Sequence, residues 1–278
     1  MQHMDFREIG RLVSSDIIAL EYLWKKNRTA ECPNCGGSEF YYLGRARARC
    51  QSCKCDIWPL KNTRFSSMKI SPSQWLSIIK LFELSVSTLK ATQDVGLSYK
   101  TTLKAYDILR RTLVEEATKD DAMFKGELEA DESYFGGKRK GKRGRGAGHK
   151  TIVYGILERG GKVMVSIIPN ASAESLLTET VKKVRRGSIV YTDKWRGYDS
   201  LMFCGYKHLS IDHRYKFKYG KVYINGIEGF WSFAKERLIK HHGISKEKFL
   251  YYIKEMEWRY NNRGKDLFEV LVDLMLKN

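Results

Sequence analysis

Apolar residues at the start of the chain recur with the period of a helix. Between residues 5 and about 27 they return at intervals close to the 3.6 residues that place side chains on one face of an α-helix. They are Phe6, Ile9, Leu12, Val13, Ile17, Leu20 and Leu23. The pattern predicts an N-terminal helix whose apolar face needs a packing partner.

Helical spacing returns between residues 72 and 118. Pro72 suits the first turn of a helix. The apolar positions that follow it are Trp75, Ile78, Ile79, Phe82 and Leu84. A short helix is then expected from about Thr88, followed by a turn at Gly96 and a longer helix capped by Ser98. This order of elements is the outline of a helix-turn-helix.

The longer of these two helices is predicted to be the recognition helix, which would contact DNA. Lys100 and Lys104 are expected to be exposed near its start, where a recognition helix contacts the major groove. Further candidates on this helix are Tyr99, Thr101, Thr102, Arg110 and Arg111. Packing of the helices without DNA contact is the alternative. Candidates for base stacking, with burial in a core as the commoner outcome, are Trp195, Trp231 and Trp258.

From Gly126 onward the pattern changes to the alternation of β-strands. Leu128, Ala130 and Ser133 alternate with charged neighbours. Three short apolar strands are expected at 152–157, 163–168 and 189–191. A helix over about residues 173–186 precedes the last of them, and the C-terminal third is again helical. This order predicts an α/β domain.

The segment from residue 32 to about residue 67 is too poor in apolar side chains for a core of its own. It holds five of the six cysteines, among them two CxxC pairs. The pairs are Cys32 with Cys35 and Cys50 with Cys53. Four thiolates at this spacing suit a tetrahedral, structural zinc ion, whose binding would stabilise the segment.

The zinc ligands leave one alternative open. Cys55 follows Cys53 closely, but only Cys53 repeats the spacing of the first pair, so we expect Cys53 to be the ligand. A hairpin of residues 40–43 with 47–49 would bring the two pairs together. Unpaired buried cysteines are the competing interpretation. The isolated Cys204 is expected to be structural.

The chain is strongly basic. Its 278 residues include 50 Lys and Arg against 32 Asp and Glu, giving a formal net charge of +18 and a pI near 9.6. A polyanionic partner is the simplest explanation. The competing polyanion is a membrane surface, but no apolar run reaches about 18 residues, so nucleic acid is favoured. Because the N-terminus lacks a secretory signal, we expect a cytoplasmic, nucleoid-associated protein.

A glycine-rich segment over residues 136–150 is the densest cluster of positive charge. Its basic residues include Lys138, Arg139, Lys140, Lys142, Arg143 and Arg145. We expect a flexible loop that binds DNA phosphates beside Asp131, with a merely solubilising hairpin as the alternative. The segment also matches the nucleotide-binding pattern GxxxxGK, but Arg143 stands where that motif needs Ser or Thr, which argues against ATP binding.

Three acidic residues stand where they could bind metal ions. Asp131 lies in a strand and Asp193 at the end of another, where a carboxylate can face a cleft on a rigid support. Glu228 lies in a helix that begins near Gly226, and Lys235 follows two turns later on the same face. Three carboxylates can hold two divalent cations and leave positions for water and phosphate. Each acid taken singly is more often an ordinary surface group.

Two neighbouring residues leave the ligand set open. Glu132 adjoins Asp131 but points to the opposite face of the strand, so a register error of one residue would exchange their roles. Asn225, one helical turn before Glu228, suits either an additional ligand or the cap of the helix.

Several motifs together carry a family resemblance. Besides the CxxC pairs they are ADESYFGG (130–137), YTDKWRGY (191–198), NGIEGFW (225–231), HGIS (242–245) and EWRYN (257–261). With these motifs the chain resembles, over nearly its whole length, bacterial insertion-sequence transposases of the DDE type that have an N-terminal zinc ribbon and an ISXO-like catalytic domain. The interval from Asp193 to Glu228 is close to the spacing usual in such enzymes.

The resemblance implies a multidomain α/β protein. The expected parts are an N-terminal helix (1–28), a zinc ribbon (29–68), a helix-turn-helix region (69–122) and an RNase H-like catalytic domain (123–278). In that domain Asp131, Asp193 and Glu228 would hold Mg²⁺ or Mn²⁺, and Lys235 would contact a phosphate near the scissile bond. His242 is a weaker candidate for similar work.

The resemblance also implies an activity and partners. The enzyme would cleave and rejoin phosphodiester bonds at the ends of an insertion sequence, as at least a dimer bound to terminal inverted repeats and target double-stranded DNA. Two rivals are a catalytically inactive, transposase-derived DNA-binding regulator and an RNase H-like nuclease. The intact acids and Lys235 argue against the first rival, and the ribbon with the helix-turn-helix argues against the second.

Overall fold

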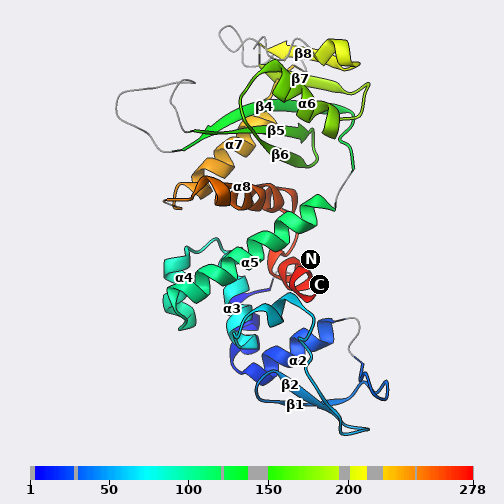
Figure 1. Ribbon diagram of the computed structural model, residues 1–278, viewed down its shortest axis with the longest axis vertical. Helices are drawn as coiled ribbons and strands as arrows, with labels where there is room; N and C mark the ends of the chain where they lie inside the picture. The colour runs from blue at the N-terminus through cyan, green and yellow to red at the C-terminus, as the bar shows by residue number, and fades with distance from the viewer. Residues whose placement is uncertain are drawn as a thin grey trace. The chain divides into compact units, whose positions relative to one another are not determined.

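The computed structural model describes residues 4–27, 31–119, 122–136, 150–193, 201–211, 222–241 and 243–277. It shows a mixed α/β protein with two compact units. The first comprises Met1–Thr112 with Asn262–Asn278, and the second comprises Leu113–Asn261 (Figure 1). None of the described helices has the length and apolar character needed to span a bilayer.

The helix expected over residues 5–27 is two helices in the structure. The helices of the first unit are α1 (Phe6–Val13), α2 (Asp16–Lys26), η1 (a 3₁₀ turn, Arg64–Ser67), α3 (Pro72–Glu83), α4 (Thr88–Val95), α9 (Leu267–Leu276) and most of α5 (Tyr99–Thr118). The Ser15 hydroxyl accepts a hydrogen bond from the Ile17 amide at 3.1 Å, and so caps α2. This cap starts a new helix, so the apolar pattern continues from α1 into α2 although the helix itself is interrupted between them.

Helix α3 forms the centre of the first unit. It lies against α1, α2 and α9, and its Trp75 indole donates a hydrogen bond to the Phe65 carbonyl at 3.1 Å. The C-terminal helix α9 buries Phe268 and Leu271 in this unit. The segment 123–278, expected as one domain, therefore contributes its last helix to the N-terminal unit, because the apolar face of α9 has its packing partner there.

Helices α4 and α5 form the turn expected for a helix-turn-helix. Gly96 takes φ of +69°, a left-handed conformation that glycine adopts without steric penalty. Lys100 and Lys104 are exposed near the start of α5. Arg110, in contrast, is only 2% exposed, and its guanidinium lies 5.5 Å from the ring centroid of Phe82. The expectation that Arg110 faces DNA is therefore wrong: it belongs to the core, where aromatic rings cover its charge.

A small antiparallel sheet forms the ribbon of the first unit. Its strands are β1 (Phe40–Leu43), β2 (Arg47–Cys50) and β3 (Asp56–Ile57), in the order β1-β2-β3. The hairpin predicted for residues 40–43 and 47–49 is confirmed. One face packs on α2 through an edge-to-face contact between Trp24 and Phe40, with ring centroids 5.6 Å apart.

The second unit is built on a five-stranded mixed sheet with the order β6-β5-β4-β7-β8. The strands are β4 (Glu127–Phe135), β5 (Thr151–Glu158), β6 (Val163–Ile168), β7 (Ile189–Asp193) and β8 (Lys207–Ile211). β4, β5 and β6 are antiparallel neighbours, whereas β7 and β8 run parallel to β4. The central strand is therefore β4, paired on both sides.

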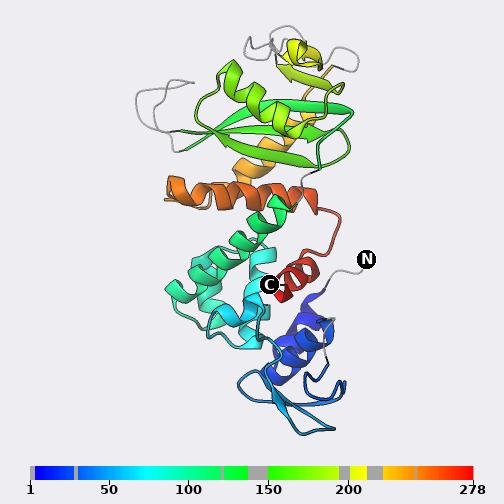
Figure 2. The same ribbon diagram turned by 45° about the vertical axis from the view of Figure 1, so that its right-hand side comes forward.

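Helices cover both faces of this sheet. They are α6 (Ala173–Lys183), α7 (Asn225–Leu238) and α8 (Lys246–Asn261). α6 packs on one face in a core that includes Leu128, Tyr154 and Leu176, whereas α7 and α8 pack on the other face around Val153, Phe230 and Ile253 (Figure 2). Side chains that alternate along β4 therefore face different helices.

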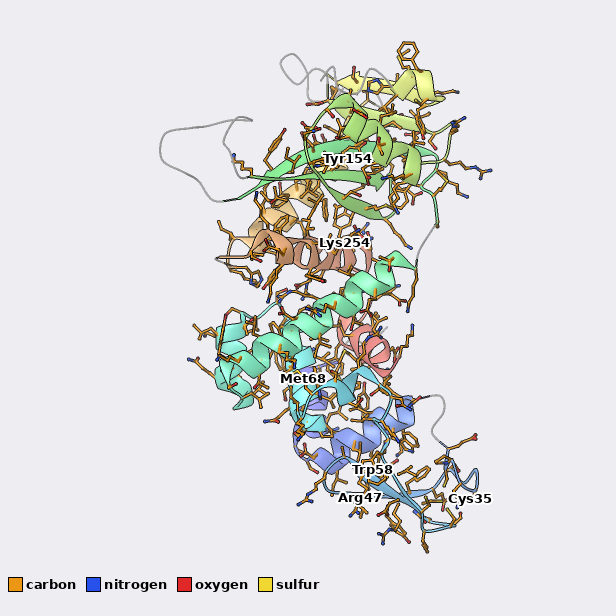
Figure 3. The ribbon with its side chains drawn as sticks, in the orientation of Figure 1. Cys35, Arg47, Trp58, Met68, Tyr154 and Lys254 are labelled. Carbon is orange, nitrogen blue, oxygen red and sulfur yellow. The ribbon has the colours of Figure 1, made fainter. Side chains whose placement is uncertain are left out.

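Residues of the motif EWRYN form hydrogen bonds with the backbone of the edge strand β6. Asn261 accepts a hydrogen bond from the Val163 amide and donates one to the Val163 carbonyl, both at 2.8 Å. One helical turn earlier, Glu257 accepts a hydrogen bond from the Val165 amide at 2.7 Å and pairs with Lys254, which is labelled in Figure 3. Side chains of α8 thus replace the missing neighbour of edge strand β6 and protect it from pairing with another chain.

We predict that Asn261→Ala destabilises the protein. The change leaves the amide and the carbonyl of Val163 without these partners, which should lower the free energy of unfolding by about 1–3 kcal/mol. Urea denaturation measures the loss. The control Lys246→Ala, at an exposed position of the same helix, should stay within about 0.5 kcal/mol of the wild type. Equal effects of the two substitutions would contradict a role in sealing the edge.

Candidate active site and metal centres

Acidic side chains line one face of the central strand. Glu127, Glu129 and Asp131 alternate along β4 and therefore share the face that α7 covers. The parallel strand β7 pairs with β4 so that Glu129 lies beside Tyr191. Asp131 and Asp193 each lie two residues beyond this pair. Their carboxylates are therefore on the same face of neighbouring strands.

Asp131 is held between the sheet and α7. The Trp231 indole donates a hydrogen bond to Asp131 Oδ2 at 3.1 Å. The Trp231 ring lies over Gly155 so closely that a Cβ there would be 2.6 Å from it. Burial, together with the charges of Glu132 and Asp193, raises the pKa of Asp131 to about 7. No described basic side chain forms an ion pair with Asp131, so negative charge accumulates here.

The strand register distinguishes Asp131 from its neighbour. Asp131 is paired with Gly155, on the face that α7 covers, whereas Glu132 is paired with Tyr154. Tyr154, labelled in Figure 3, belongs to the core on the α6 side. Glu132 therefore influences Asp131 through its charge but belongs to the opposite face.

Helix α7 presents a polar stripe near these acids. Glu228 in its first turn and Lys235 two turns later are both exposed, and Lys235 Nζ lies 5.8 Å from the ring centroid of Phe135 at the end of β4. Asn225 is the first helical residue and is exposed; the N-cap is Ile224. Asn225 is therefore not the cap of this helix.

The three carboxylates do not form a compact cage by themselves. Among the described residues, the cysteines are the only group of three or more potential ligands whose donor atoms all lie within 4.8 Å of one another. Asp131 and Asp193 interact through their charges, but the structure does not gather Glu228 with them at that spacing.

A partly buried arginine neutralises the other two carboxylates of the row. Arg159 donates hydrogen bonds to Glu127 at 2.8 Å, to Glu129 at 3.2 Å and to the Tyr223 carbonyl at 2.8 Å. Its guanidinium lies between the rings of Tyr191 and Tyr223, 3.7 and 3.9 Å from their centroids. Sequence reasoning missed this cluster, because a single arginine after a strand forms no recognisable motif.

The CxxC pairs meet at one point in the ribbon. The four cysteines are Cys32, Cys35, Cys50 and Cys53. The sulfur atoms lie 3.6 Å apart in the pair Cys32 and Cys53 and also in the pair Cys35 and Cys50. A tetrahedral site with Zn–S bonds of about 2.3 Å requires sulfur atoms roughly 3.8 Å apart. The spacing of this cysteine cluster is therefore compatible with zinc.

Local hydrogen bonds prepare the cysteine cluster for a cation. The Gly36 amide donates to the Cys32 carbonyl at 2.8 Å, which closes the first turn. Hydrogen bonds from the Asn34 side chain and the Cys55 backbone lower the pKa of Cys53 to about 6 and so favour its thiolate. The Cys55 thiol points elsewhere: it approaches the Asp56 carbonyl at 3.5 Å.

Other candidates from the sequence separate into three groups. Trp231 and Trp258 are 4% and 8% exposed and belong to the interior, so they are not available to stack on bases. On the predicted recognition helix Tyr99 and Arg111 are exposed, whereas Thr102 is buried, so the expectation that Thr102 contacts base edges is wrong. Eight further candidates lie outside the described residues. They are Lys138, Arg139, Lys140, Lys142, Arg143, Arg145, Trp195 and His242.

Comparison with known proteins identifies the family. Residues 123–261, half of the chain, match the ISXO2-like transposase domain. The chain belongs to the ISXO2-like transposases. A transposase-like protein of Haemophilus influenzae is 46% identical over 101 residues, which are 36% of this chain and 82% of that protein. A protein in the transposable element ISH50 of Halobacterium salinarum is 25% identical over 273 residues, which are 88% of this chain and 91% of that protein.

Solved structures give a weaker likeness for this ISXO2-like transposase. The Mos1 transposase paired-end complex with the left transposon end has a TM-score of 0.31 and 11% sequence identity. The match covers 72% of this chain and 77% of the Mos1 chain.

We predict that Asp131→Asn stabilises the transposase at about pH 8 without added magnesium. The folded pKa of about 7 lies above the ordinary value of 3.8, so the ionised carboxylate opposes folding above that range. The penalty should decline as pH falls from about 8 toward 4, because the folded state takes up the proton first. Urea denaturation should show an advantage of the variant on the order of 4 kcal/mol at about pH 8, because the pKa is raised from 3.8 to about 7. A difference that does not change with pH would contradict this prediction.

We predict that Cys53→Ser removes zinc from the ribbon, whereas Cys55→Ser retains it. Of these two cysteines, only Cys53 has its sulfur in the cysteine cluster. Elemental analysis of the purified chain should give about one zinc per chain for the wild type and for Cys55→Ser, and clearly less for Cys53→Ser. Equal zinc loss in both variants would instead identify Cys55 as a ligand.

Proposed function

We propose that this ISXO2-like transposase is an active DNA transposase that cleaves and joins phosphodiester bonds at the ends of an insertion sequence. One observation carries the proposal: Asp131 and Asp193 lie on the same face of adjacent strands, beneath the helix that bears Glu228 and Lys235. Membership of the transposase family supports the same conclusion.

We infer that the second unit is an RNase H-like catalytic domain. The order β6-β5-β4-β7-β8 places three antiparallel strands beside two parallel ones, with the first strand of the unit in the centre. Helices on both faces complete the arrangement. In this fold the chemistry belongs beside the central strand, where Asp131 lies.

The acids fit divalent cations with a preference for oxygen ligands. Carboxylates suit Mg²⁺ or Mn²⁺. Burial, and then the charges of Glu132 and Asp193, raise the pKa of Asp131, and a bound cation would relieve both effects. Asp131, Asp193 and Glu228 would hold the ions, which when bound would activate water and stabilise the leaving oxygen. Glu228, in the first turn of α7, would approach the ions from the helix side.

The protein's own groups would orient the reactants. Trp231 fixes one oxygen of Asp131 through its hydrogen bond of 3.1 Å and so directs the other oxygen. Lys235, exposed on the same face of α7 as Glu228, would bind a phosphate beside the scissile bond and neutralise developing charge. No nucleophilic side chain is required, because water and then a DNA 3′ hydroxyl supply the attacking oxygen.

DNA would be held by two basic surfaces. Lys100 and Lys104 lie exposed near the start of α5, as expected of a recognition helix that reads the terminal repeats. The basic segment Lys138–Arg145 would contact phosphates on the catalytic side, which accords with the net charge of +18. The zinc of the ribbon would be structural, since four thiolates leave no open position.

The test is strand transfer in vitro. With Mg²⁺ and a DNA fragment bearing the inverted repeats that flank the gene, the wild type should cleave and join. Asp193→Ala and Glu228→Gln should reduce joining by at least about 100-fold, because each removes a ligand oxygen or its charge. Glu236→Gln, an exposed position on α7, is the matched control and should retain joining.

The same assay separates the rival functions. Specific binding of the repeats without cleavage would identify a DNA-binding regulator. Cleavage without joining would identify a nuclease. Undiminished joining by Asp193→Ala would overturn the assignment of the three acids.

A further inference from the structure

The first turn of α7 is held by a side chain from another element. Its N-cap Ile224 offers no side-chain hydrogen bond. Glu129 of β4 takes that role, since its Oε2 accepts a hydrogen bond from the Ile227 amide at 3.0 Å. Glu129 is 1% exposed, so this carboxylate meets the positive end of the helix in the interior of the unit.

Glu129 is itself fixed on its other oxygen. Arg159 donates to Glu129 Oε1 at 3.2 Å and, through another nitrogen, to the carbonyl of Tyr223 just before the helix. The rings of Tyr191 and Tyr223 hold the guanidinium from both sides. One arginine therefore connects β4 and β7 to the chain that enters α7.

A glycine makes this close approach possible. A Cβ on Gly226 would lie 2.8 Å from Glu129 Oε2 and 3.1 Å from Leu157 Cδ2. Any larger residue would therefore push the first turn of α7 away from the sheet or displace the Glu129 carboxylate. Gly226 in the motif NGIEG thus leaves room for the hydrogen bond between the Ile227 amide and the Glu129 carboxylate.

We propose that Glu129 and Arg159 are positioning residues for Glu228, and that they hold the first turn of α7 in register with Asp131. The inference rests on the proposed function, because Glu228 is assigned as a metal ligand there. Glu129 lies two residues before Asp131 on the same strand, and its partner Ile227 lies one residue before Glu228. This hydrogen bond therefore couples the strand that carries one proposed ligand to the first turn of the helix, where the other proposed ligand lies.

The chemistry of Glu129 favours positioning over simple packing. A buried carboxylate is unfavourable unless hydrogen bonds and an opposite charge compensate it, whereas an aliphatic residue would fill the same volume without that requirement. Glu127 shows the contrast: it also binds Arg159, but its side chain is 40% exposed, whereas Glu129 is buried and accepts the Ile227 amide. Glu129→Ala and Glu127→Ala therefore form a matched pair.

The first readout is hydrogen–deuterium exchange of the full-length protein without added magnesium. Glu129→Ala should speed exchange of the amides in the first turn of α7 by about tenfold, because one hydrogen bond is lost. Glu127→Ala should leave these amides at the wild-type rate. Glu129→Gln keeps an oxygen that can accept the bond and should restore most of the protection.

The second readout is the Mg²⁺ dependence of strand transfer. Glu129→Ala should raise the half-activating Mg²⁺ concentration by on the order of tenfold while the affinity for repeat DNA stays unchanged, and Glu129→Gln should recover most of this loss. If Glu129→Ala fails to fold, Gly226→Ala takes its place, since the added Cβ displaces the Glu129 carboxylate. It should shift both readouts in the same direction.

The outcomes separate this inference from the proposed function. Unchanged exchange in α7, or equal effects of Glu129→Ala and Glu127→Ala on magnesium dependence, would overturn the positioning role while joining by the wild type still stands. Wild-type protein without strand transfer would overturn the proposed function, yet the exchange experiment would still decide whether Glu129 anchors α7.

Discussion

The contact of α7 with the central strand is the constraint on which the second unit depends. β4 carries three carboxylates on the face that this helix covers, and negative charge under a helix is unfavourable unless each group has a partner. Arg159 and the Ile227 amide compensate the row at Glu127 and Glu129. Asp131 receives only neutral hydrogen-bond donors among the described residues and lies beside the charge of Asp193. Glu127 and Glu129 thus have compensating partners. Asp131 has no described cationic partner, and a metal cation would fit beside it.

Glycines let the helix and the sheet come this close. Gly155 makes room for the indole that orients Asp131, and Gly226 makes room for the carboxylate that anchors α7.

The ribbon of the first unit is stabilised in a different way. It has few apolar residues, and its cysteine cluster supplies a point where a metal can replace the missing core. In both units, small residues or short turns place charged or polarisable atoms where a cation can compensate them.

Much of this protein was determined by local sequence. The hairpin of the ribbon, the turn at Gly96 and the α/β order after residue 126 were predicted, because alternation, caps and glycine conformations act over a few residues. The CxxC spacing likewise indicated the cysteine cluster, since each pair lies on one tight turn. The proposed acids could be named from strand ends and motifs, but the strand pairing that places Asp131 and Asp193 on the same face could not be derived from spacing alone.

Only the tertiary structure decided which groups oppose one another. Asp131 faces α7, whereas Glu132 faces away from it. Arg110 is buried among aromatic rings, and α9 packs in the N-terminal unit. Arg159 had no motif, because its partners come from three distant segments and their meeting depends on strand pairing and helix packing. Local patterns fix the period and the ends of each element, whereas long-range contacts fix the face to which each side chain turns.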